Sequence, residues 1–406
     1  MIVNPQQLLD DGFIILERVI PPGLLDSLRT SYEILVERQG GQSWLDKGRQ
    51  PRLTINHLVD ETTADTIEFW LHENTLGVSR QLMRGPEAAV TEMFMMCSPL
   101  RQHGPADWHR DFDPSGMAPL EGLQMDVLEN GPAYLQWNIS LYDDSVLWLV
   151  PKSFRRPNTK TENHQLRENP HVPLPGSIPV ELKAGDGVVY INLTLHWGSN
   201  YGTTLRRTLH GGYRSIGGPL YPYNASSCNW DLNMDFTQYL SPAAQATFEG
   251  WAALLVQERY LVESLFQTIL AKNTDNFHTY LTKLHPEKKG QIVCLMLLSK
   301  LARYIYKLKH LDIAKLTPTE QARSISTSPD VFSFYNDFVR RFSTPEVNRL
   351  WDLFTSLDVK LQADTQQEVP GRPNQSPNYI YSKMPTDFDV ADFVAGWSKN
   401  LMGSNI

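Results

Sequence analysis

The middle of the chain carries short runs with β-strand character and little helical spacing between them. These runs are rich in β-branched and aromatic residues, and clusters of Gly, Pro and Asp separate them; they cover residues 90–97, 133–142, 146–150, 188–195 and 208–214. Parallel strands need a crossover connection, usually a helix, and this part of the chain offers few. We therefore predict that residues 88–216 form an antiparallel sandwich or barrel rather than an alternating βαβ fold.

The flanks of this zone have a different pattern. Residues 12–19 are predicted to form a short strand, and a helix follows the next turn with one apolar face made of Leu24, Leu25, Leu28, Tyr32 and Leu35. From about Ser241 onward the pattern becomes helical. Ser-Pro and Thr-Pro pairs, which are typical helix starts, recur at residues 241–242, 317–318, 328–329 and 344–345.

Two stretches near the C-terminus are informative. Apolar residues recur at helical spacing between residues 287 and 310; they are Ile292, Leu295, Met296, Leu298, Leu301, Ala302, Ile305 and Leu308. Residues 369–385 are predicted to be an extended connector, and a helix follows with Val390, Phe393, Val394, Trp397 and Leu401 on its apolar face. The expected class is α+β, with a strand-rich domain over residues 1–220 and a mostly helical extension over residues 221–406.

Composition excludes several classes of protein. Hydrophobic residues make up 41% of the 406 residues and charged residues 20%, which is ordinary for a folded chain. With 37 basic and 45 acidic residues the net charge is −8, so no nucleic-acid partner is expected. The 3 cysteines fit neither a disulfide framework nor a cysteine-rich zinc site. The N-terminus lacks a signal-peptide pattern and no long apolar stretch occurs, so a cytoplasmic location without membrane contact is expected.

One group of polar residues in the strand-rich domain has the spacing of a metal site. In the extended segment from Trp108 to Asp111, His109 and Asp111 are two residues apart and point to the same side of a strand, so both can reach one ion. His196, at the end of an apolar strand, would add a second imidazole. Two imidazoles and one carboxylate on one face of an octahedron leave the other face open, which suits non-haem Fe(II) that binds O2 and a co-substrate.

Other residues compete for these ligand roles. Asp107 and Asp113 are alternative carboxylates on the same strand face, although the two-residue spacing favours Asp111. His210 competes with His196 but lacks a following arginine at the matching distance.

A candidate anion anchor follows His196. Arg206 lies ten residues further on, and a neighbouring antiparallel strand could bring it back beside the metal. A guanidinium with the Thr208 hydroxyl two residues on is suited to hold a carboxylate through a bidentate fork and one extra donor. A dicarboxylate such as 2-oxoglutarate needs such an anchor at its far end. Arg207 is the alternative, and we favour Arg206 because Thr208 then lies on the same strand face.

With these residues in place, the chain resembles the phytanoyl-CoA 2-hydroxylase (phytanoyl-CoA dioxygenase) family of Fe(II)/2-oxoglutarate-dependent oxygenases. The similar segments lie within residues 8–216 and read DGFIILERVIPPGLLDSLR, WHRDFD, ISLYDDSVLWLVPKSFRR and LKAGDGVVYINLTLHWGSN. The chain departs from the family pattern at Phe154, where a histidine is usual, and by one missing residue after His196. Asp111 keeps the carboxylate ligand, which disfavours a halogenase.

The resemblance implies a double-stranded β-helix, a jelly roll of cupin type, with flanking helices. It implies a dioxygenase that oxidises, most simply hydroxylates, an unactivated C–H bond of a small organic molecule such as a secondary metabolite, with release of succinate and CO2. Fe(II), 2-oxoglutarate and O2 are the implied cofactor and co-substrates. His109, Asp111 and His196 would be the catalytic metal ligands, and Arg206 and Thr208 would hold 2-oxoglutarate.

Two further expectations concern the cavity and the helical extension. The polar face of residues 133–142 would point into a jelly-roll cavity, with Asn138 as the expected 2-oxoglutarate contact. Residues 221–406 would form a lid, packing around the barrel, or a dimerisation element that makes a homodimer. Two other classes stay open: a non-catalytic jelly-roll binding protein, and a cupin-type metal-dependent isomerase or hydrolase. The spacing of Arg206 and Thr208 argues against both.

Overall fold

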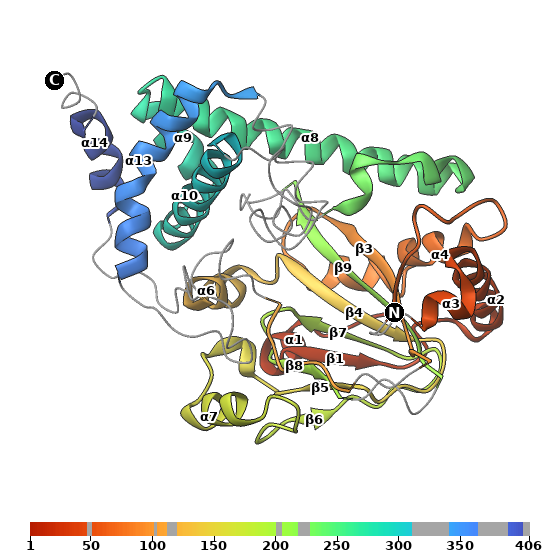
Figure 1. Ribbon diagram of the computed structural model, residues 1–406. Helices are drawn as coiled ribbons and strands as arrows, with labels where there is room; N and C mark the ends of the chain where they lie inside the picture. The colour runs from red at the N-terminus through yellow and green to blue at the C-terminus, as the bar shows by residue number, and fades with distance from the viewer. Residues whose placement is uncertain are drawn as a thin grey trace.

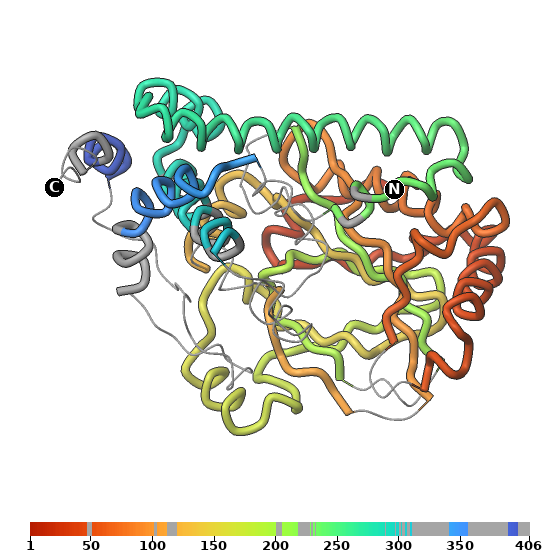
Figure 2. Tube along the Cα trace, turned by 45° about the horizontal axis from the view of Figure 1, so that its top comes forward, coloured from red at the N-terminus to blue at the C-terminus, as the bar shows by residue number. Residues whose placement is uncertain are grey.

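The computed structural model of the chain describes residues 1–46, 51–100, 104–111, 120–199, 205–217, 228–310, 341–363 and 389–400. A strand-rich part and a group of helices lie next to one another, and the long helix α8 (Pro242–Leu270) runs from one to the other (Figures 1 and 2). The predicted α+β class is confirmed by antiparallel sheets combined with many helices. No helix in the described part of the chain is long and apolar enough to cross a membrane.

The strands form two antiparallel sheets. The larger sheet has the order β1-β7-β4-β9-β3-β2, with β1 at Phe13–Leu16, β2 at Arg52–Thr54, β3 at Glu87–Cys97, β4 at Tyr134–Ser140, β7 at Gly187–Ile191 and β9 at Arg207–Ile216. The smaller sheet has the order β6-β5-β8, with β5 at Leu147–Leu149, β6 at Ile178–Pro179 and β8 at His196–Gly198. All these strands fall within or beside the predicted runs, apart from the short strands β2 and β6.

The two sheets pack face to face. Leu147 and Leu149 of β5 share one buried apolar cluster with Val188 and Tyr190 of β7. Side chains alternate along β4: Leu135, Trp137 and Ile139 belong to the main core on the outer face. The other face of β4 carries polar side chains toward the smaller sheet, as the Gln136 contact described below demonstrates.

Helices cover the outer face of the larger sheet. Those before β3 are α1 (Pro5–Asp11), α2 (Pro22–Gln39), α3 (Gly41–Leu45), α4 (Asp65–Glu68), η1 (Phe69–Leu71) and α5 (Leu76–Leu82). The predicted apolar face of α2 buries Leu28, Tyr32 and Leu35, whereas Leu24, in the first turn, is 40% exposed. Between the later strands lie α6 (Leu120–Asn130), η2 (Ser153–Arg155) and α7 (Lys160–Glu168).

The run 188–195 is not one strand, contrary to the prediction. β7 ends at Ile191, and a turn closed by Thr194 N–H donating to Ile191 C=O (2.8 Å) carries the chain across to the smaller sheet. His196 therefore begins β8 instead of ending the apolar strand. The side chains on both sides of the crossing are buried, so the hydropathy of this run does not change where the chain changes sheets.

The C-terminal helices have a second core. Apart from α8 they are α9 (Thr274–Leu284), α10 (Lys288–His310), α13 (Thr344–Ala363) and α14 (Val390–Asn400), preceded by η4 (Asn229–Leu232) and η5 (Asp235–Tyr239). The described part of the predicted apolar faces of α10 and α14 is buried in this core, which contains Leu295, Met296, Ile305, Val390 and Val394. The side chains of the other predicted members, Leu301, Leu308, Trp397 and Leu401, lie outside the described part of the chain. The N-terminal half of α8 packs instead into the main core, through Phe248, Trp251 and Leu255.

The predicted helix starts are confirmed only in part. Ser241 caps α8, since its side chain accepts from Ala244 N–H. At α13 the cap is Ser343, whose Oγ accepts from Glu346 N–H, because Thr344 already lies inside the helix. The pairs at 317–318 and 328–329 and the connector at 369–385 lie outside the described residues.

Candidate metal centre

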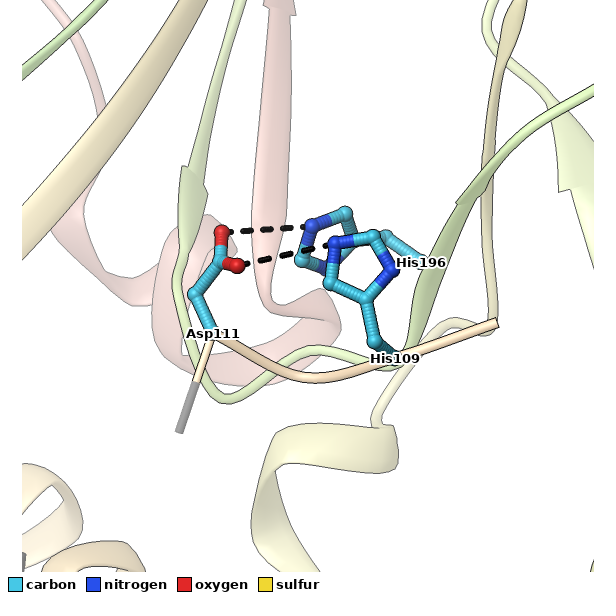
Figure 3. A group of neighbouring side chains, drawn as sticks. All are labelled: His109, Asp111 and His196. Carbon is cyan, nitrogen blue, oxygen red and sulfur yellow. Dashed lines mark ion pairs between the residues drawn. The ribbon is translucent and has the colours of Figure 1, made fainter. Parts of the chain in front are cut away.

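Three of the predicted site residues meet between the sheets. His109, Asp111 and His196 each offer one donor atom, and these atoms lie within 4.8 Å of one another (Figure 3). The backbone creates this proximity: His109 N–H donates to His196 C=O (3.0 Å), and His196 N–H donates to His109 C=O (2.9 Å). This two-residue β-bridge joins the extended segment before Asp111 to β8.

Both imidazole rings are oriented by backbone carbonyls. The His109 Nδ1 lies 2.7 Å from Asp107 C=O, and the His196 Nδ1 lies 2.8 Å from Thr194 C=O. A carbonyl can only accept, so each Nδ1 donates its proton to it, and Nε2 is the ring nitrogen left to bind an ion. These Nε2 atoms face Asp111, at 3.5 Å from Oδ1 for His109 and 3.3 Å from Oδ2 for His196. The two Nε2 atoms and the carboxylate thus face one another and could bind one cation between them.

The spacing of the donors fits one metal ion. Ligand atoms bound at about 2.1 Å and at right angles to one another lie about 3 Å apart, close to the separations found here. Two neutral imidazoles and one carboxylate are the donor set of non-haem Fe(II) sites with open coordination positions. The residues present therefore fit an iron ion.

The Asp111 carboxylate is held from several directions. Gln136 of β4 donates its Nε2–H to Oδ2 (2.5 Å), and Asn192 bonds the backbone of Asp111 in both directions at 3.0 Å. Burial on its own would raise the pKa of Asp111, but the neighbouring imidazoles of His196 and His109 and the Gln136 bond keep this pKa below its usual range. The carboxylate is thus ionised and ready to bind a cation.

Arg110 is a structural part of the site that the sequence reasoning missed. Its Nη1 donates to Ser153 C=O (2.8 Å) and to Leu193 C=O, and its Nη2 donates to Asn158 Oδ1 (2.8 Å). These bonds tie the ligand segment to the loop after β5 and to the turn before β8. An arginine between two predicted ligands, pointing to the opposite strand face, was the available signal.

The competing carboxylates and histidine lie elsewhere or outside the described residues. Asp107 is exposed and binds His171 Nε2 at 2.5 Å, and Asp113 lies outside the described part of the chain. His210 contributes to no metal-ligand group among the described residues; its Nδ1 instead meets Asn138 Oδ1 at 2.7 Å.

The predicted anchor Arg206 is buried and already has an acidic partner. Its Nε donates to Asp144 Oδ2 (2.8 Å), and the Thr208 hydroxyl donates to the same oxygen. Burial would raise the pKa of Asp144, but the Arg206 charge and the Thr208 bond keep it below its usual range. Arg207 points the other way, to Glu33 of α2 (2.6 Å). The structure thus brings Arg206 and Thr208 together and separates Arg207 from them.

Three further polar residues, Asn138, His210 and Tyr190, lie on strands of the larger sheet near the candidate metal ligands. Asn138 and His210 form a buried pair across β4 and β9, and the Tyr190 ring packs edge-on against His196 with centroids 5.3 Å apart. Burial first, and the Arg52 charge second, lower the pKa of His210 to about 3, so its imidazole is neutral at physiological pH. Asn138 lies on the interior face, as expected, and is bonded there to His210.

Tryptophans fix the two ligand-bearing segments to one another. Trp108 and Trp197, each adjacent to a histidine of the site, stack with centroids 5.4 Å apart, and Trp148 meets Trp197 edge-on at 6.0 Å. Their indole N–H groups donate to backbone carbonyls, from Trp108 to Val172 (2.8 Å) and from Trp197 to Ala106 (2.6 Å). Phe154, where the family pattern has histidine, is fully buried in the main core.

Comparison with known proteins yields structural matches only. No protein-family model matches the sequence, and no curated protein matches it. One matched structure is SnoN, a non-heme alpha ketoglutarate dependent epimerase from nogalamycin biosynthesis, with 16% identity over 52% of this chain and 79% of that chain and a TM-score of 0.38. A second is AviO1 from Streptomyces viridochromogenes Tue57, with 21% identity over 54% of this chain and 96% of that chain and a TM-score of 0.40. A third is HygX from Streptomyces hygroscopicus with nickel and 2-oxoglutarate bound, with 15% identity over 53% of this chain and 87% of that chain and a TM-score of 0.40. With identities of at most 21% and TM-scores of at most 0.40, these three matches leave the family of the chain unassigned.

Proposed function

We propose that the chain is an Fe(II)- and 2-oxoglutarate-dependent oxygenase of the phytanoyl-CoA dioxygenase type, built on a double-stranded β-helix. One observation carries this proposal: two imidazoles with their Nδ1 atoms tied to carbonyls turn their Nε2 atoms toward an ionised carboxylate, at distances that fit one ion. His109, Asp111 and His196 would hold the iron from one side. The opposite side would stay open to the co-substrate and O2.

The proposed reaction balances as R–H plus 2-oxoglutarate plus O2 giving R–OH, succinate and CO2. When bound, the iron supplies the activation of O2 that this oxidation needs. The contribution of the chain is orientation. Carbonyls fix both rings, Gln136 and Asn192 keep the Asp111 carboxylate in place, and the buried walls exclude water. The substrate is proposed to be a small organic molecule.

Arg206 and Thr208 are the proposed anchor for the distal carboxylate of 2-oxoglutarate. Asp144 binds Nε of Arg206 and the Thr208 hydroxyl, so the guanidinium and the hydroxyl are held side by side. Nη1 of Arg206 donates to the Met96 sulfur at 3.7 Å, and a thioether is a weaker acceptor than a carboxylate. Asn138, held by His210, is proposed to contact the same co-substrate.

The first test is anaerobic addition of Fe(II) and 2-oxoglutarate to the full chain. Wild type is expected to develop the weak visible charge-transfer band of an iron-chelated 2-oxo acid. His109→Ala and Asp111→Ala are expected to lose this band and more than about 100-fold of succinate formation, because each lacks one of three ligands. Asp107→Asn is the matched control, an exposed carboxylate on the same segment that should keep both signals.

Either result can overturn the assignment. Full turnover in His109→Ala or Asp111→Ala would show that the residue is not a ligand. A wild-type protein that binds Fe(II) in calorimetry but gives no band with 2-oxoglutarate would overturn the oxygenase proposal and favour the alternative, a cupin-type metal-dependent isomerase or hydrolase.

The same band tests the anchor. Arg206→Gln is expected to weaken 2-oxoglutarate binding about 10- to 100-fold, since a charge-assisted pair is lost. Arg207→Gln should leave the affinity unchanged because Arg207 faces Glu33 on α2. The reverse outcome would move the anchor by one residue.

We further propose that residues 1–220 form the catalytic core and that the helical extension serves as a lid or as a dimerisation element. The buried contacts of α8 with the main core support an extension fixed to the core at one end. Gel filtration of the full chain would distinguish a homodimer from a monomer.

A further inference from the structure

Arg52 is a cation on the larger sheet whose side chain has no acidic partner among the described residues. It lies on β2, the edge strand of the larger sheet, and is exposed. Its side chain forms no hydrogen bond or ion pair with another of the described residues, whereas Arg206 pairs with Asp144, Arg207 with Glu33 and Arg214 with Glu258. The charge of Arg52 is therefore uncompensated within the described part of the chain.

The strand register places Arg52 on the interior face. Arg52 pairs with Met96 of β3, and Met96 pairs with Thr208 of β9. Directly paired residues of antiparallel strands point to the same side of the sheet, so Arg52, Met96 and Thr208 share the face that carries Arg206 and Asp144. Two strand spacings of about 4.8 Å put the Arg52 Cα about 10 Å from that of Thr208, within reach of a long side chain. Met96 lies between the two guanidinium-bearing residues, its sulfur 3.7 Å from Arg206 Nη1.

The charge of Arg52 acts on residues next to the metal ligands. After burial, Arg52 is the strongest influence that lowers the pKa of His210, with Arg206 and His196 acting in the same sense and Asp111 opposing. Burial and Asp111 raise the pKa of Tyr190, and Arg52 opposes them there too. Tyr190 packs against His196. The Arg52 guanidinium thus lies close enough to His210 and Tyr190 for its charge to act on both.

We propose that Arg52 binds an anionic group of the substrate, a carboxylate or a phosphate, while Arg206 holds 2-oxoglutarate. This inference rests on the proposed oxygenase function and adds a substrate class to it. Two observations separate the roles of the two arginines. Arg206 is buried and shares the carboxylate of Asp144, as suits a fixed co-substrate site, whereas Arg52 is exposed at the sheet edge, where a ligand arriving from solvent meets it first. A guanidinium fork matches both carboxylate and phosphate oxygens.

The test measures anion binding by the full chain loaded anaerobically with Fe(II) and saturating 2-oxoglutarate, so that the co-substrate site is filled. Acetate and methyl phosphate are titrated by calorimetry, with acetamide as the uncharged probe. Wild type is expected to bind at least one of the two anions and not acetamide. Arg52→Gln should bind that anion about tenfold more weakly. Arg80→Gln, which removes a surface arginine paired with Glu87, is the matched control and should bind like wild type.

A charge-reversal variant sharpens the result. Arg52→Glu is expected to lose the anion and to bind methylammonium, which wild type should not bind.

Equal anion affinity in wild type and Arg52→Gln, or no anion binding by wild type, would overturn the proposal. A loss of 2-oxoglutarate affinity in Arg52→Gln as large as in Arg206→Gln, without separate anion binding, would also overturn it and make Arg52 a co-substrate anchor. Absence of the 2-oxoglutarate band in wild type would sink the oxygenase proposal, whereas the acetate comparison would still decide whether Arg52 binds anions.

Discussion

His210 is a neutral imidazole among charged groups. It is buried on β9, bonded to Asn138, and surrounded by Arg52, Arg206, Asp111 and His196. Its pKa of about 3 lies below that of a histidine in an unfolded chain, so only the unfolded state takes up a proton as the pH falls below about 6.5. Stability therefore rises with pH between about 3 and 6.5 through this residue.

His210→Gln should remove this part of the acid sensitivity. Between pH 7 and pH 5 the free energy of unfolding should fall about 2 kcal/mol less in His210→Gln than in wild type. Urea unfolding at the two pH values measures the difference, and His164→Gln, at an exposed histidine of α7, is the control. An unchanged pH dependence in His210→Gln would show that His210 is protonated in the folded state.

At the level of single residues, sequence spacing identified the proposed metal ligands but not the residues that hold them in place. The two-residue spacing of His109 and Asp111 reflects strand geometry, which a sequence displays directly. Asp144 and Gln136 act through partners that are distant in sequence, and no local pattern marks such pairs. The pairing of Asp144 with Arg206 appears only once β9 and the loop after β4 are placed side by side.

Among the elements, the stacked tryptophans join the two segments that carry the ligands. Trp108 and Trp197 belong to a small cluster separate from the main core, and it includes Val150, Leu166 and Leu195. This cluster fixes the register between the segment 104–111 and β8, and with it the distance between His109 and His196. The orientation of His109 and His196, the proposed metal ligands, thus depends on apolar packing one residue away.

Trp197→Leu should loosen the site without unfolding the chain. We expect about a tenfold loss of Fe(II) affinity, comparable to the loss of an outer-shell partner of a metal ligand, together with a reduced melting temperature. Trp44→Leu removes a buried tryptophan of α3 away from the site and should change stability only. Calorimetric titration of Fe(II) into both variants measures their Fe(II) affinities. Equal affinities of the two variants would show that Trp197 has no positioning role.

Elements differ in how well the sequence reveals them. Helix α10 was predictable because burial of one face imposes a helical period on its apolar residues. The crossing between β7 and β8 was not, because residues on both sides of the turn are apolar and buried. Strand β2 is short and lay outside the predicted runs, although it carries Arg52.

On the scale of the whole molecule, α8 links the sheets to the helical extension. Its N-terminal half belongs to the main core and its C-terminal half, from Val262, to the second core. At the transition, Glu258 of α8 forms an ion pair with Arg214 of β9, and both side chains are buried. The start of α8 at Ser241 and Pro242 was readable from the sequence, but the packing of its two halves into different cores depends on tertiary contacts.

Glu258→Gln should weaken this link. Removing one partner of a buried ion pair leaves an uncompensated charge, which costs about 3 kcal/mol or more. Urea unfolding followed by tryptophan fluorescence measures this loss of stability, because Trp251 of α8 and the neighbouring Trp230 are buried in the folded chain. Glu249→Gln, at an exposed position of the same helix, should leave stability within about 0.5 kcal/mol of wild type. Equal effects of the two substitutions would contradict the role of the pair.

During synthesis on the ribosome, His109 and Asp111 emerge long before His196, so the growing chain first offers an ion only two of the three donors. The third arrives when β8 pairs with the segment before Asp111 through the reciprocal bonds between His109 and His196. Backbone pairing, not the ion, brings the histidines together. A cell short of iron is therefore expected to accumulate a folded apoprotein rather than an unfolded chain, and equal protease resistance with and without a chelator would reveal it.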